Sequence, residues 1–185
     1  MQSQTKGTMK TIELKVYEFD ELSDLAKDKA RNWYREGALD YEWWESTYED
    51  AARIGLRITS FDLDRNRHAC GEFNCIGQGE QCASLILTEH GKDCETFKTA
   101  TAYLADLAKL NAEIEAVDGD DETNVEFETW QDKRGELEGE FLGSLLEDYS
   151  IMLQRECEYI MADEQVDESI RANGYTFDEA GNREG

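Results

Sequence analysis

The residues best suited to metal or thiol chemistry are His68 and the cysteines Cys70, Cys75, Cys82 and Cys94. Zinc sites commonly place two cysteines two to four residues apart. The gap between Cys70 and Cys75 lies at the edge of that range, and the other two cysteines do not form a second pair. Reduced cysteines on strands more often serve as small apolar core residues. The sequence therefore favours core thiols and no metal, with His68, Cys70, Cys75 and Cys82 as weak zinc candidates.

The other motifs that suggest chemistry are incomplete. Cys75 could act as a nucleophile beside one of the two histidines, but nothing in the sequence indicates an environment that activates it. Residues 118–129 superficially resemble a calcium loop, but Thr123 stands where that loop needs glycine. Glu128 also falls one place short of the last ligand position. We therefore expect no enzymatic activity and no cofactor.

The charge of the chain is strongly negative and unevenly distributed. The formal net charge is −24 over 185 residues. Residues 111–170 hold 20 acidic residues and only three basic ones, Lys133, Arg134 and Arg155. Such a field repels nucleic acid and anionic membranes and attracts basic surfaces. This excludes direct nucleic-acid binding and favours a basic protein partner, and it leaves the oligomeric state open.

Residues 136–159 predict a helix that is apolar on one side and acidic on the other. At about 100° per residue, Glu136, Glu140, Glu147 and Glu158 fall within about 40° of one line along it. Acids one turn apart rise by about 6 Å, which is comparable with phosphate spacing in nucleic acid. These glutamates are therefore candidates for partner binding; the alternative is that they only solvate the helix. Glu156 falls within the apolar arc, and we expect it to pair with a base from elsewhere.

Two further segments are candidates for partner contact. The polar turn before the helix adds acidic residues to the predicted partner-binding surface: Asp118, Asp120, Asp121 and Glu122. Trp43 and Trp44 are adjacent, and helical spacing cannot bury both on one face, so one could lie at an interface. The favoured alternative places both in the core, one against a sheet and one under the C-terminal tail.

The elements that must position these residues predict an α+β fold. We expect a single domain over 1–185, with 1–9 flexible, in which about four helices pack on a small, mainly antiparallel sheet. A long amphipathic acidic helix is expected near 135–161. Further helices are expected from Ser23 as N-cap, over 41–55, over 94–116 and in the tail. Strands are expected at 11–19, 56–64, 124–130 and in a hairpin around the turn GQGEQ.

The chain carries no signal for a membrane or for secretion. No run of 18 or more apolar residues occurs, and the N-terminal lysines are not followed by an apolar segment. We therefore expect a cytoplasmic protein.

Two stretches resemble a family of small proteins encoded by tailed phages and prophages. These are KTIELKVYEFDELSDLAKDKARNWYREGALDYEWWESTYEDAARIG (10–55) and ADEQVDESIRANGYTFDEAGNRE (162–184), which together cover somewhat over a third of the chain. Members are mostly uncharacterised, and some are loosely labelled antitoxins of toxin–antitoxin stability systems. The segment 60–82 departs from the aromatic and glycine-rich middle of its relatives. The resemblance implies a phage accessory protein in the cytoplasm of an infected bacterium.

Together these observations predict a phage-encoded, non-enzymatic inhibitor of bacterial defence. Its acidic surface would mimic nucleic acid and occupy the basic groove of a CRISPR–Cas complex or a restriction nuclease. One alternative is an antitoxin-like module that binds a basic toxin. Another is a phage housekeeping protein whose acidic surface only solvates the fold.

Overall fold

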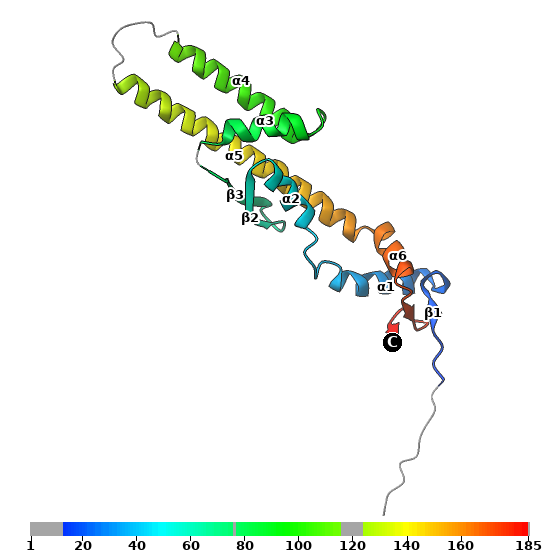
Figure 1. Ribbon diagram of the computed structural model, residues 1–185. Coiled ribbons are helices and arrows are strands. Elements are labelled where there is room, and N and C mark those ends of the chain that lie inside the picture. Colours follow the sequence, from blue (N-terminus) through cyan, green and yellow to red (C-terminus); the bar gives the residue numbers. More distant parts are fainter. Residues whose placement is uncertain (1–12, 76, 116–123, 185) are drawn as a thin grey trace, which may run out of the picture. The chain divides into compact units, whose positions relative to one another are not determined.

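The computed structural model describes residues 13–75, 77–115 and 124–184, which fold into two compact units (Figure 1). The terminal unit combines the residues up to Tyr41 with those from Glu158 onward. The central unit runs from Glu42 to Cys157. Small antiparallel sheets packed by helices confirm the α+β class. The extent of a single domain over 1–185 stays a prediction, and residues 1–9 lie outside the described part.

The terminal unit packs two helices against a small sheet. Its helices are α1 (Asp24–Gly37) and α6 (Asp163–Ala172), and η1 (Phe19–Glu21) is one short 3-10 turn. The strands β1 (Tyr17–Glu18), β4 (Thr176–Phe177) and β5 (Arg183–Glu184) form an antiparallel sheet in the order β1-β4-β5. Apolar residues from all these layers form one core: Phe19, Leu22, Ala26, Ala30, Val166, Ile170 and Phe177.

Two local features fix α1 within this unit. The predicted N-cap is confirmed, since the hydroxyl oxygen of Ser23 accepts a hydrogen bond from the backbone N–H of Ala26 at 3.4 Å. Gly181 adopts a φ of +81°, and a Cβ built there would lie 2.2 Å from the carbonyl oxygen of Ala26. Only glycine allows the C-terminal turn to approach α1 this closely.

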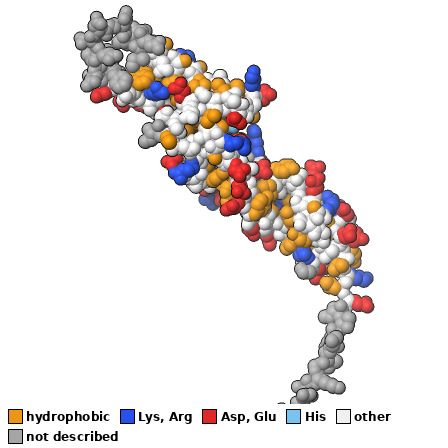
Figure 2. Space-filling view, in the orientation of Figure 1, with side chains coloured by type: hydrophobic (Ala, Val, Ile, Leu, Met, Phe, Trp, Pro, Cys, Tyr) orange, Lys and Arg blue, Asp and Glu red, His pale blue; other side chains and the backbone are white. Residues whose placement is uncertain are grey.

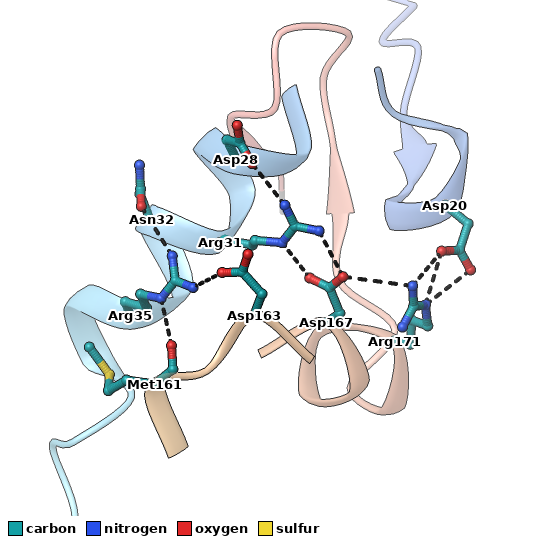
Figure 3. A network of polar contacts seen from close by, with 9 residues as sticks. All are labelled: Asp20, Asp28, Arg31, Asn32, Arg35, Met161, Asp163, Asp167 and Arg171. Atoms are coloured by element: carbon teal, nitrogen blue, oxygen red, sulfur yellow. Dashed lines mark hydrogen bonds and ion pairs between the residues drawn. The ribbon is translucent and has the colours of Figure 1, made fainter. Parts of the chain in front are cut away.

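Arginine side chains connect the helices of the terminal unit through carboxylates (Figure 3). Arg31 of α1 forms two hydrogen bonds to Asp167 of α6, at 2.7 and 2.8 Å, and one to Asp28. Arg35 of α1 contacts Asp163 and donates to the carbonyl oxygen of Met161 at 3.0 Å. The same figure shows Arg171 of α6 between Asp20 and Asp167.

Within its described residues, the central unit contains one β-hairpin and four helices. The strands β2 (Leu56–Asp62) and β3 (His68–Phe73) pair antiparallel. The helices are α2 (Glu45–Arg53), α3 (Gly79–Glu89), α4 (Glu95–Glu115) and α5 (Asn124–Met161), whose last residues belong to the terminal unit. The hairpin, α2, α3, α4 and α5 share one core that includes Leu56, Ile86, Tyr103 and Leu145. Phe141 of α5 stacks on Tyr103 of α4 with centroids 4.2 Å apart.

Several predicted elements differ from those observed. The segment 124–130 is the start of α5, not a strand, because extending an existing helix adds a hydrogen bond per residue without a new nucleus. The hairpin joins β2 to β3, whereas residues 79–89 form the helix α3. Of the described residues in the predicted strand 11–19, only Tyr17–Glu18 form a strand, β1, and Leu14 is 58% exposed. The predicted helix 41–55 is shorter, Glu45–Arg53.

None of the helices within the described residues combines the length and the apolar character that a membrane span requires.

Candidate functional site

The cysteine and histidine candidates do not converge. His68 and Cys70 are exposed on β3, and Cys75 is exposed beyond it. Cys82 is buried in α3, where burial raises the pKa of its thiol to about 12. Within the described ranges, no group of three or more His, Cys, Asp or Glu residues could hold a metal ion, and all five cysteines are free thiols.

The second histidine lies in a buried polar cluster that the sequence does not reveal. His90 Nδ1 lies 2.7 Å from the hydroxyl oxygen of Thr96. Its Nε2 lies 3.6 Å from Oδ2 of Asp50, which is beyond hydrogen-bond distance but close enough for an ion pair if the ring is protonated. The same carboxylate accepts a hydrogen bond from Tyr149 at 2.9 Å. Burial and the Asp50 carboxylate raise the pKa of Tyr149. The hydroxyls of Thr96 and Tyr149 are buried; Thr96 connects α4 to the residue after α3, and Tyr149 connects α5 to α2.

The long helix α5 presents the acidic residues that the sequence singles out. Glu136 and Glu140 are exposed, and no base in the described part of the chain pairs with either. Because α5 begins at Asn124, the row extends further back, to the exposed Glu128 and Asp132. The four acids are spaced by four residues, so they form one oblique row that rises by about 18 Å and turns by about 120° around the helix. We call Glu128, Asp132, Glu136 and Glu140 the acidic row.

The bases nearest the acidic row are directed to carboxylates on neighbouring helices. Arg134 pairs with Glu80 of α3 at 3.1 Å and lies over the ring of Trp130. Lys133 Nζ lies 3.9 Å from a carboxylate oxygen of Glu113 on α4. The row itself therefore keeps its negative charge at the surface. Figure 2 shows acidic side chains exposed on the face that it draws, with basic side chains among them.

Other acids of α5 stabilise the fold. Glu138 accepts a hydrogen bond from the backbone N–H of Gly79 at 3.0 Å and so satisfies a free donor at the start of α3. Asp148 accepts one from the Thr99 hydroxyl at 2.7 Å, and burial raises its pKa. Glu147, predicted as part of the partner surface, instead pairs with Arg67 at the end of the hairpin loop.

The other acidic residues singled out by the sequence lie apart from the acidic row or outside the described residues. Glu158 is exposed on α5 within the terminal unit, where it takes part in an interaction of its own. Asp118, Asp120, Asp121 and Glu122 lie outside the described residues. Glu156 is half-buried, and the ion pair expected for it is not formed among the described residues.

The two adjacent tryptophans pack on the hairpin. Trp43 is only 8% exposed, and Trp44 is half-buried. Both rings contact Phe61 of β2 edge-to-face, with centroids 5.5 and 5.7 Å away. The prediction that one tryptophan packs against a sheet and the other under the C-terminal tail is therefore wrong, because both pack on Phe61 of β2. A role in partner contact stays a prediction, and of the two only Trp44 offers appreciable ring surface.

Comparison of the chain with family models, with curated proteins and with solved structures finds no match in any of the three.

Proposed function

We propose that this protein is a non-enzymatic inhibitor that occupies the basic nucleic-acid site of another protein through its acidic row. The observation that carries the proposal is the row itself: four exposed acids, one helical turn apart, while the nearest bases pair elsewhere. Like charges at this spacing destabilise a helix. Solvation of the helix does not require acids at this spacing, whereas binding to a basic site would explain why they are present.

The electrostatics of the central unit support a basic target. It contains 27 acidic and 10 basic residues, a formal charge of −17. A strongly charged surface accelerates encounter with an oppositely charged groove, and the association weakens as salt rises. The spacing of about 6 Å between neighbouring acids is of the order of phosphate spacing, which suits a groove built for a nucleic-acid strand.

The resemblance to phage and prophage proteins supplies the class of target. We propose a bacterial defence protein, either a CRISPR–Cas complex or a restriction nuclease, met in the cytoplasm of the infected cell. An antitoxin-like protein that binds a basic toxin would use the same negative charge. The capture experiment described next distinguishes these two functions.

The test compares two variants with the same change of charge. In Asp132→Asn/Glu136→Gln/Glu140→Gln the acidic row loses three charges. The matched control, Glu42→Gln/Glu49→Gln/Glu89→Gln, removes three exposed acids of the central unit that lie off α5. Tagged proteins are used to capture partners from a bacterial lysate at low and at high salt, and each captured partner is then assayed for nucleic-acid binding.

The proposal expects the wild type and the control to capture a nucleic-acid-binding protein at low salt and to displace its nucleic acid. The row variant should do so at least about tenfold less well, because several charge contacts are lost together. Equal displacement by both variants would contradict the mimicry. Capture of a basic toxin that binds no nucleic acid would establish the antitoxin alternative in its place.

A further inference from the structure

The terminal unit contains an open pocket at the C-terminal end of α1. Its volume is about 470 Å³, within the range of small-ligand sites. Four aromatic side chains and two carboxylates line it: Trp33, Tyr34, Tyr41, Tyr175, Glu36 and Asp40.

The aromatic rings face the pocket in different planes. Trp33 and Tyr175 are perpendicular, at 87°, with centroids 5.2 Å apart. Tyr34 is tilted by 49° to Tyr175 at 6.3 Å. Tyr41 is 59% exposed at the rim. Aromatic rings of this kind attract cations to their π faces.

The chain itself supplies a precedent for a cation on these rings. The guanidinium carbon of Arg183 lies 4.9 Å from the centroid of Tyr175 and 5.6 Å from that of Trp33. Arg183 is not among the residues that line the pocket, so the pocket is a second position beside rings that already bind a guanidinium.

The charge of the lining also favours a cation. Glu36 and Asp40 are exposed, and no ion pair joins either of them to a base among the described residues. Arg35, the residue before Glu36, contacts Met161 and Asp163 (Figure 3). The C-terminal end of a helix carries partial negative charge, which adds to that of the two carboxylates.

We propose that this pocket binds the guanidinium group of an arginine on a protein partner. A guanidinium is planar, so it can stack on a ring while its N–H groups donate to carboxylates at its edge; the ammonium of lysine cannot do both. The pocket lies in the terminal unit and the acidic row in the central unit, so this proposal does not depend on the proposed function.

The experiment is an NMR titration of the full-length chain with acetyl-Gly-Arg-Gly-amide. Two matched peptides carry lysine or citrulline in place of arginine; citrulline has nearly the same shape without the charge. We expect the arginine peptide to shift the Trp33 indole and Tyr175 ring signals saturably. The citrulline peptide should bind at least about tenfold more weakly, in line with the loss of a cation–π contact and its ion pairs.

Variants locate the binding. Glu36→Gln/Asp40→Asn should weaken the arginine peptide about tenfold, whereas Glu13→Gln/Glu179→Gln, the same charge change away from the pocket, should have little effect. Tyr41→Ala should also weaken binding of the arginine peptide. If that variant unfolds, the result for Glu36→Gln/Asp40→Asn alone tests the location of the site. Equal binding of the arginine and citrulline peptides, or shifts that avoid Trp33 and Tyr175, would overturn the proposal. Binding of agmatine without binding of the arginine peptide would overturn the assignment to a protein partner.

Discussion

Two acidic sites, Asp167 in the terminal unit and the acidic row in the central unit, have opposite surroundings. In the terminal unit, Asp167 lies between Arg31 and Arg171, so its carboxylate joins α1 to α6. That unit has 16 acidic and nine basic residues, against 27 and 10 in the central unit. On α5 of the central unit, the acidic row stays exposed while Lys133 and Arg134 pair elsewhere. Acidic residues therefore hold two helices together at the first of these sites and stay unpaired at the surface at the second.

The largest expected effect comes from breaking the Arg31–Asp167 pair. Its side chains are only 18% and 14% exposed, so Arg31→Ala leaves a largely buried carboxylate with its main partner lost. We expect a loss of about 3 kcal/mol in the free energy of unfolding, measured by urea denaturation. Arg57→Ala in the central unit is the control, because Arg57 and Glu72 are 64% and 56% exposed and such pairs contribute about 0–1 kcal/mol. Equal losses of stability in Arg31→Ala and Arg57→Ala would contradict a special structural role of the Arg31–Asp167 pair.

Neutralising the acidic row should change stability in the other direction. Asp132→Asn/Glu136→Gln/Glu140→Gln removes three like-charge neighbours along α5, each of which costs about 0.2–0.5 kcal/mol. We expect the variant to gain about 1 kcal/mol at low ionic strength, and less in salt, which screens the repulsion. Asp167→Asn should destabilise the protein under the same conditions. A loss of stability in the row variant would show that the row supports the fold.

The smallest expected effect concerns Asp148, an acid of α5 that is half-buried. Burial raises its pKa in the folded state, so the folded protein binds this proton more readily than the unfolded chain does. Stability from this group is therefore greatest at acid pH and decreases as pH rises from the ordinary Asp pKa through the raised one. Asp148→Asn should remove that decrease, which urea denaturation at pH 3 and at pH 7 would measure. An unchanged pH profile would contradict the assignment.

Local patterns predicted part of this fold. The N-cap at Ser23, the end of the acidic helix at Met161 and the exposure of Glu136 and Glu140 follow from capping chemistry and helical periodicity. The start of α5 at Asn124 could not be predicted in this way, because the alternation at 124–130 also suits a strand. An earlier helix start would have revealed Glu128 and Asp132 at the same four-residue spacing.

Long-range contacts explain the remaining differences. The start of α3 is capped by Glu138, a residue 59 positions further along the chain, and Glu147 reaches Arg67 across 80 positions. No local pattern indicates such partners. The pocket of the terminal unit likewise brings Tyr175 to Trp33 and Tyr34 through the packing of the C-terminal turn on α1.

The division of the chain also sets an order of assembly during synthesis. The central unit is one continuous segment and is complete once Cys157 has left the ribosome. The terminal unit is discontinuous: α1 is made before the central unit, but the apolar partners that it packs against, Val166, Ile170 and Phe177, are made only after it. Since compact units tend to fold as they emerge, α1 must remain without its core until α6 and β4 have been made. A chain that ends before α6 would therefore have a complete central unit and an exposed apolar face on α1.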